Sequence, residues 1–166
     1  MKSEDEVFNV EIRRLKSLVE AETCARIMSD SEPWITLRRD YEDSLKTIQH
    51  PSKDVYLALV NNEIKGFIIL QMSGVFVGYL QTVAVLPEWR NRGIGSKMIK
   101  FAEDRIFKEF PNVFLCVSSF NRKAQELYKR LGYETVGELK DFIVRGHSEI
   151  LLRKTIGPLI DYNKNK

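Results

Sequence analysis

The segment at residues 90–96 has the composition of a phosphate-binding loop. It reads Arg-Asn-Arg-Gly-Ile-Gly-Ser, and it stands between a β-rich run that ends before Pro87 and a run with apolar residues at helical spacing. The first N–H groups of a helix have no partner within the helix and lie at the positive end of its dipole, so they bind phosphate. Gly93 and Gly95 would let a ligand approach the main chain closely. The sequence therefore predicts a loop that binds a phosphate group.

Two well-known phosphate-binding motifs do not match this loop. The dinucleotide-binding fingerprint needs a third glycine where Met98 stands. The P-loop needs Gly-Lys-Ser/Thr, whereas Gly95 is followed by Ser96 and Lys97. A Rossmann enzyme and a P-loop NTPase are both excluded.

The periodicity of apolar residues predicts the elements that position this loop. They follow in the order β-α-α-β-β-β-α-β-α-β-β. The expected strands are residues 7–15, 54–60, 63–72, 76–86, 113–117, 133–144 and 147–154. The expected helices are residues 17–29, 34–48, 94–108 and 122–131, the last between an Asn121 N-cap and Gly132. Hairpins mixed with strand-helix-strand crossovers indicate an α/β (α+β) fold with a mixed sheet and helices on its faces.

Composition limits the class of protein. The 166 residues are 43% hydrophobic and 30% charged, which is typical of one folded domain, here residues 1–160, followed by a polar tail at residues 161–166 without fixed structure. The 26 basic and 23 acidic residues are mixed along the chain, so we expect neither a nucleic-acid nor a membrane partner. The sequence has no leader-like or membrane-spanning apolar run, so we expect a cytoplasmic protein. Cys24 and Cys116 lack ligand spacing, so we expect no metal site.

Two motifs resemble those of the GCN5-related N-acetyltransferase (GNAT) family. Arg90, Gly93 and Gly95 fit its Arg/Gln-x-x-Gly-x-Gly/Ala motif, and the segment from Asn121 to Tyr133 resembles its second signature. The order of elements also resembles this family over nearly the whole chain. The resemblance implies a mixed, mostly antiparallel sheet of about seven strands, flanked by about four helices and with two splayed central parallel strands.

The resemblance further implies that acetyl-CoA, as cosubstrate, lies between the strands at residues 76–86 and 113–117. Main-chain groups of Val83 and Val85 would then bind the thioester carbonyl and the pantetheine, and the loop amides would bind the pyrophosphate. The residues expected to bind the cofactor are Val83, Val85, Arg90, Asn91, Arg92, Gly93, Ile94, Gly95, Ser96 and Asn121. Asn121 would also cap its helix.

Tyr128 matches the tyrosine that this family places near the cofactor sulfur. A phenol stays protonated at neutral pH because its pKa is near 10, so it can donate a proton to the departing thiolate. The alternative is an ordinary core tyrosine on an amphipathic helix.

The residue that removes the proton of the acceptor amine is the open question. The glutamate that many family members place on the strand before the loop is missing, since no carboxylate lies between Glu63 and Glu88. Similarity to members that acetylate N-terminal amines favours Tyr79, acting through an ordered water. Strict alternation along the strand would put Tyr79 and Gln81 on the same face as Val83.

The final hairpin offers alternatives to Tyr79. Asp141, His147 and Glu149 could line the mouth of the acceptor site. Trp34 could cover that site or pack in the core. Cys116 stands in a buried strand, which favours a small core residue over an acyl-carrying nucleophile.

The sequence therefore predicts an enzyme that moves an acetyl group from acetyl-CoA directly to a primary amine in a ternary complex. N-terminal acetyltransferases of this family often carry Tyr-Tyr in the last hairpin, where this chain has Asp141-Phe142, so we expect a small-molecule amine before a protein N-terminus. A noncatalytic acyl-CoA sensor is the alternative from a different class. The sequence leaves a homodimer open.

Overall fold

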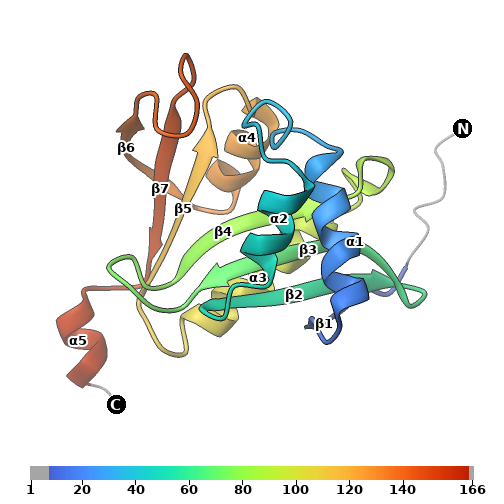
Figure 1. The fold of residues 1–166 in the computed structure, drawn as a ribbon. Helices are drawn as coiled ribbons and strands as arrows, with labels where there is room; N and C mark the ends of the chain where they lie inside the picture. Colours follow the sequence, from blue (N-terminus) through green and yellow to red (C-terminus); the bar gives the residue numbers. More distant parts are fainter. Residues whose placement is uncertain (1–7, 165–166) are drawn as a thin grey trace, which may run out of the picture.

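The chain folds around a seven-stranded sheet (Figure 1). The structure, a computed structural model, describes residues 8–164. The strands are β1 (Glu11–Arg14), β2 (Lys53–Val60), β3 (Glu63–Gln71), β4 (Tyr79–Val85), β5 (Asn112–Ser118), β6 (Glu134–Leu139) and β7 (Glu149–Thr155). The helices are α1 (Leu18–Ser29), α2 (Tyr41–Ile48), α3 (Ile94–Ile106), α4 (Arg122–Arg130) and α5 (Leu159–Lys164).

The strand order is β1-β2-β3-β4-β5-β7-β6, and every neighbouring pair is antiparallel except β4 and β5. These two parallel strands pair only where Tyr79 faces Phe114 and Leu80 faces Leu115, and they diverge beyond that point. The predicted mixed sheet with splayed central parallel strands is thus confirmed. Main-chain groups on the facing edges of β4 and β5 are left without a strand partner beyond Leu80.

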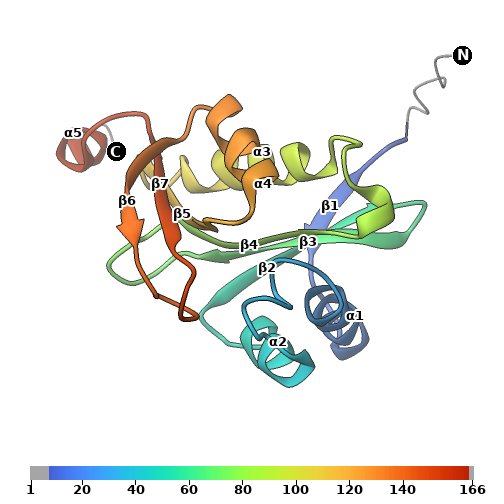
Figure 2. The same ribbon diagram turned by 90° about the horizontal axis from the view of Figure 1, so that it is seen from above.

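Helices cover both faces of the sheet. Figure 2 shows α1 and α2 on one side and α3 and α4 on the other. Under α3, the buried residues Met98 and Ile99 belong to the same core cluster as Leu70. Under α1, Cys24 belongs to a second cluster with Phe67. Because side chains alternate along β3, successive residues of this strand pack in two separate cores, one on each face of the sheet.

A β-bulge interrupts β4. Leu80 pairs with Leu70, but the next paired residue is Thr82, which pairs with Ile69, so Gln81 has no partner on β3. A bulge inserts one extra residue into a strand and shifts all later side chains to the opposite face.

The bulge corrects the expectation that Tyr79, Gln81 and Val83 share a face. Tyr79 lies on the side of α1 and α2, whereas Val83 packs against the core cluster under α3 and α4. The alternation of residues within β4 could not predict this change of face, because a bulge is defined by the pairing of β4 with β3.

The second helix is shorter than the predicted residues 34–48, since α2 begins at Tyr41. The Asp40 side chain caps it by accepting a hydrogen bond from the Asp43 N–H at 2.9 Å. Arg38 has a φ of 54°, which breaks any helix running through it. Residues 33–38 form turns instead.

Several strands also differ from their predicted bounds. β1 covers only Glu11–Arg14 of the predicted residues 7–15, of which residue 7 lies outside the described part of the chain. β4 begins at Tyr79 and not at residue 76, because Gly78 turns the chain with a φ of 81°. β6 ends at Leu139, and Asp141, with a φ of 50°, lies in the loop that follows. β7 begins at Glu149, two residues later than predicted.

The tail expected to lack fixed structure is helical from Leu159 to Lys164 as α5. The Tyr162 hydroxyl donates a hydrogen bond to the main-chain carbonyl of Phe107, directly after α3. This contact anchors the helix, which the polar composition of the segment did not suggest. Residues 165 and 166 lie outside the described part of the chain.

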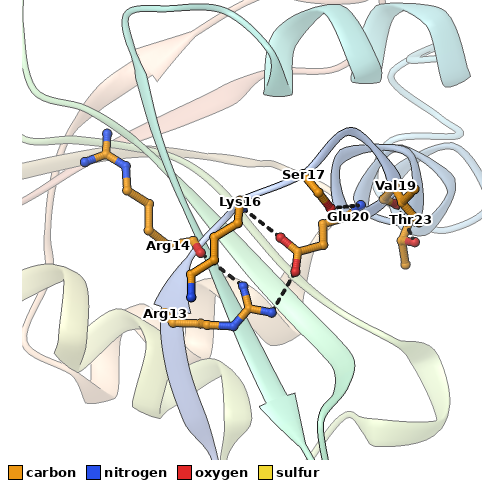
Figure 3. A network of polar contacts seen from close by, with 7 residues as sticks. All are labelled: Arg13, Arg14, Lys16, Ser17, Val19, Glu20 and Thr23. Atoms are coloured by element: carbon orange, nitrogen blue, oxygen red, sulfur yellow. Dashed lines mark hydrogen bonds and ion pairs between the residues drawn. The ribbon is translucent and has the colours of Figure 1, made fainter.

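A polar network fixes the start of α1 against β1 (Figure 3). The Ser17 hydroxyl accepts from the Glu20 N–H at 3.2 Å, and the Glu20 carboxylate accepts from the Lys16 N–H at 2.7 Å. The Arg13 guanidinium donates to the same carboxylate at 2.6 Å and lowers the pKa of Glu20. The junction is therefore a capping box extended by an ion pair.

No helix within residues 8–164 is long and apolar enough to cross a membrane. The same residues contain no group of three or more His, Cys, Asp or Glu side chains that could hold a metal ion.

Candidate active site

A cavity of about 450 Å³ lies where β4 and β5 diverge. Its lining residues from the sheet are Tyr79, Leu80, Gln81, Thr82, Val83, Cys116, Val117, Ser118 and Glu149. Those from the helices and loops are Met28, Pro33, Trp34, Leu37, Arg39, Ser44, Thr47, Asn121, Ala124, Tyr128, Phe142 and Ile143. Because the lining comes from both faces of the sheet, the cavity joins the two faces through the gap between the strands.

The predicted phosphate loop has open amides. Asn91 and Gly93 have φ values of 61° and 80°, and Gly93 is the N-cap of α3 with no side-chain capping bond. The N–H groups of Ile94, Gly95 and Ser96 therefore have no capping partner and remain available to an anion. The structure thus presents the amide arrangement that a pyrophosphate would need.

The arginines of the loop make contacts that the sequence did not indicate. The Arg90 Nε donates to the Val85 carbonyl at 3.0 Å, and its Nη2 donates to the Glu32 carbonyl at 3.4 Å. The Arg92 guanidinium lies 4.7 Å from the centre of the Trp89 ring. Arg90 therefore ties the loop to the end of β4, in addition to the positive charge that it contributes.

The main chain of β4 faces the gap at the two predicted valines. The Leu86 N–H donates to the Lys65 carbonyl, so Leu86 points its main-chain groups towards β3. Alternation then points the groups of Val85 and Val83 towards the gap, and the bond from Arg90 to the Val85 carbonyl agrees with this direction. A carbonyl has two lone pairs, so Val85 can still accept a second hydrogen bond.

Asn121 and Tyr128 meet at the α4 side of the cavity. The Asn121 Oδ1 accepts from the Ala124 N–H at 3.3 Å, which confirms the predicted cap. Tyr128 is only 8% exposed, and its ring packs edge-on against Tyr133 at 5.5 Å. Burial raises the pKa of Tyr128, which keeps its hydroxyl protonated.

Tyr79, Cys116 and Glu149 form a cluster on the other side of the gap. Burial, together with the neighbouring Cys116 thiol, raises the pKa of Tyr79. Burial also raises the pKa of Cys116, which is the inert setting expected of a core thiol. Both groups are therefore neutral near pH 7.

Glu149 is the only acid among the described residues that line this cavity. The residue is 4% exposed, and the Ser118 hydroxyl donates to its Oε1 at 2.6 Å. Burial raises the pKa of Glu149, and the bond from Ser118 opposes this shift without cancelling it. A carboxyl group with a raised pKa is suited to exchange protons near neutral pH.

The other two candidates of the final hairpin lie outside the cavity. The Asp141 carboxylate accepts from the Gly146 N–H at 2.6 Å and fixes the loop. The His147 ring packs against Phe120 at 4.9 Å. Of the three sequence candidates, the structure brings only Glu149 to the site.

Two residues of the site had no signal in the sequence. Ser118 supports Glu149 from a strand 31 positions away in the chain. Ser44 on α2 lines the cavity, is 1% exposed, and has no hydrogen-bond partner for its Oγ among the described residues. For Trp34 the sequence left open a cover of the acceptor site or a place in the core; the residue lines the cavity, is 9% exposed and belongs to the core cluster that contains Cys24.

Comparisons with known proteins agree with this architecture. The sequence matches the acetyltransferase (GNAT) family over residues 15–133. A thialysine N-epsilon-acetyltransferase from Bos taurus is 43% identical over 61 residues, which cover 36% of each chain. An N-alpha-acetyltransferase from Sulfurisphaera tokodaii is 29% identical over 111 residues, which cover 58% of this chain and 66% of that one. The chain thus matches less than two thirds of the length of either relative.

Solved structures share the fold at low sequence identity. An aminoglycoside 6'-N-acetyltransferase complexed with coenzyme A has a TM-score of 0.74 at 17% identity, covering 89% of this chain and 98% of that chain. The ribosomal-protein-S18-alanine N-acetyltransferase from Escherichia coli has a TM-score of 0.69 at 19% identity, covering 90% and 96%. With the family match over most of the sequence and the splayed strands beside the open loop, the chain belongs to the acetyltransferase (GNAT) family.

Proposed function

We propose that the protein is an N-acetyltransferase that moves an acetyl group from acetyl-CoA directly to a primary amine of a small molecule in a ternary complex. One observation carries this proposal: residues of β4 at the gap, Tyr128 and a buried carboxylate, Glu149, line a single cavity. A direct transfer needs a site for the thioester, a proton donor for sulfur and a proton acceptor for the amine, all within one enclosure.

The residues present fit acetyl-CoA. The open amides at the start of α3 suit its pyrophosphate, and a side chain added at Gly95 would come no closer than 3.9 Å to Val85, so the loop leaves space for a ligand. When bound, acetyl-CoA supplies the acetyl group as an activated thioester. The Val83 N–H would donate to the acetyl oxygen as negative charge develops on it, and Asn121 would contact the cofactor from α4.

Tyr128 would donate its hydroxyl proton to the departing sulfur. Its pKa is raised by burial, so the proton is present at neutral pH. Tyr128 lines the cavity from α4, as does Asn121, the residue that caps this helix.

Glu149 would accept the proton that the amine loses. An alkyl ammonium group has a pKa near 10, so little free amine exists at neutral pH and a base is needed. Tyr79, our first candidate from the sequence, is itself neutral and poorly acidic, since burial raises its pKa. We therefore assign Tyr79 the positioning of the amine or of a water between the amine and Glu149.

A small acceptor suits the enclosure of the site. Trp34, Leu37, Phe142 and Ile143 wall the cavity on the acceptor side and leave a volume of about 450 Å³. The relative from Bos taurus is named for the N-epsilon nitrogen of thialysine, which is also a small acceptor. A protein N-terminus is the second candidate, because the relative from Sulfurisphaera tokodaii is named for N-alpha acetylation.

The test is an assay of thiol release from acetyl-CoA with small primary amines and with peptides that have free N-termini. Acetylated products are identified by mass spectrometry. We expect turnover of small amines. Tight binding of acetyl-CoA without thiol release in any reaction would contradict the enzyme and favour the sensor.

Replacing Tyr128 with phenylalanine is expected to lower kcat by about tenfold to a thousandfold, because the proton donor in the transition state is lost. The affinity for acetyl-CoA, measured by calorimetry, should change by no more than a few-fold. Tyr133→Phe is the matched control, since Tyr133 packs on Tyr128 without lining the cavity. Equal kcat in Tyr128→Phe and the wild type would reduce Tyr128 to a core residue.

A further inference from the structure

A second cavity of about 450 Å³ adjoins the acceptor side of the active site. It shares the lining residues Leu37, Arg39 and Ile143 with the first cavity, so the two cavities are neighbours. Its other lining residues are Arg38, Asp43, Val144 and Arg145. An acceptor that extends from the first cavity past these shared residues would reach the second.

The second cavity has an excess of positive charge. Arg38, Arg39 and Arg145 are exposed, and none of their guanidinium groups has a hydrogen bond or ion pair with any residue in the described range 8–164. Among the described residues that line it, Asp43 is the only acid, so the charges of three arginines are opposed by one. Unpaired arginines grouped around a concavity are suited to bind an anion.

Two ordered loops carry these arginines, and Figure 1 shows them at the same end of the molecule. The Arg39 N–H donates to the Trp34 carbonyl, and Asp40 directly after it caps α2. Arg145 stands in the loop that the bond from the Gly146 N–H to Asp141 closes. Asp40 and Asp141, the acids of these two loops nearest to the arginines in sequence, each accept a hydrogen bond from a main-chain N–H group.

We propose that these arginines bind a carboxylate of the acceptor, so that the acceptor is a small molecule with a primary amine at one end and a carboxylate at the other. This inference rests on the proposed acetylation of an amine. The amine would lie near Glu149, the spacer along Leu37 and Ile143, and the carboxylate among Arg38, Arg39 and Arg145.

The charge of the second cavity also selects against other amines. A polycationic acceptor would bring further ammonium groups next to the arginines, and like charges at this distance repel. A plain alkylamine would leave the arginines unpaired. Amines with a carboxylate, uncharged alkylamine chains and polyamines should therefore differ in their affinity for this cavity because of their charge.

The experiment compares three amines of the same length: ε-aminocaproate, hexylamine and hexamethylenediamine. We expect kcat/KM for ε-aminocaproate to exceed that for hexylamine by about tenfold, and the preference to shrink at high salt because exposed charges are screened. Equal values, or a preference for the diamine, would overturn the inference. Turnover of hexylamine at any rate supports the proposed function separately.

Two further measurements complete the test. If no amine is acetylated, the proposed function fails, and calorimetric titration of ε-aminocaproate against hexylamine in the presence of coenzyme A still decides the carboxylate site. Equal binding would overturn it. The second measurement uses peptides with aspartate or alanine at the second position. If the aspartate peptide is acetylated faster than ε-aminocaproate, the carboxylate that the arginines bind belongs to a peptide, and the inference of a small-molecule acceptor is overturned.

Arg145→Glu is expected to reduce the preference for ε-aminocaproate over hexylamine by about tenfold, with hexylamine turnover retained. Arg153→Glu is the matched control, since Arg153 is exposed on β7 and lines neither cavity. Equal losses for both amines in Arg145→Glu, or an equal loss of preference in the control, would overturn the role of the cluster.

Discussion

Replacing Gly95 with aspartate is expected to weaken acetyl-CoA binding by about a hundredfold or more, because a carboxylate would then stand where the α3 amides meet the pyrophosphate. The fold should survive. Gly95 is the second residue of α3, its φ is not in the left-handed region, and an added Cβ would have Val85 as its nearest neighbour at 3.9 Å. An acidic residue in the first turn even favours the helix dipole. Calorimetry with acetyl-CoA and a thermal unfolding scan measure the two effects.

Gly95→Asn separates charge from size. Asparagine has nearly the shape of aspartate without its charge, so it should lose much less affinity. Gly93 is less suitable for this test, because its φ of 80° would strain another residue. A loss of affinity could then reflect a change in folding instead of a change in cofactor binding. Near-native affinity in Gly95→Asp would remove the loop from the cofactor site.

Replacing Glu149 with glutamine is expected to lower kcat by about a hundredfold or more at pH 7, because the acceptor amine loses its base. The wild-type rate should rise with pH as Glu149 ionises, with a midpoint above the usual carboxyl range because burial raises its pKa. The variant should lose that midpoint and approach the wild type only at alkaline pH, where free amine is abundant. The pH profile of kcat/KM measures both effects.

Stability provides a control for Glu149→Gln. The glutamine oxygen can still accept the bond from Ser118, so the local structure should persist. A group whose pKa is raised by folding destabilises the fold once it ionises, so Glu149 favours the folded state at low pH and costs stability as the pH rises through its raised pKa. The variant should therefore be at least as stable as the wild type at pH 8. His147→Ala, outside the cavity, should keep the wild-type profile, and the reverse pattern would move the base to His147.

Features of this molecule that depend on a few neighbouring residues were predictable from the sequence. The Asn121 cap, the open loop before α3 and the divergence of two parallel strands follow from local residue types and from family motifs. The membership in the GNAT family, which the motifs indicated, is confirmed.

Features that depend on pairing between distant segments were not predictable. The bulge at Gln81 exists only relative to β3, and it reversed the predicted face of Tyr79. The burial of Glu149 depends on the pairing of β7 with β5, which sets it opposite Ser118. The sequence therefore could not distinguish Glu149 from Asp141 as a candidate base, although the Asp141 carboxylate only accepts a hydrogen bond from Gly146 within its own loop.

The extra residue in β4 has a consequence for how acceptors diversify. Beyond the bulge, the main chain of Val83 and Val85 faces the gap that the cofactor would use. The side chains of Tyr79 and Thr82 lie on the face of the sheet that α1 and α2 cover, where the proposed amine would bind. The seven residues of β4 thus divide into two groups. Val83 and Val85 would serve the cofactor in any acetyl transfer, whereas the residues at Tyr79 and Thr82 would differ from one acceptor to another. Substitutions at these two positions could therefore change the acceptor without a loss of cofactor binding.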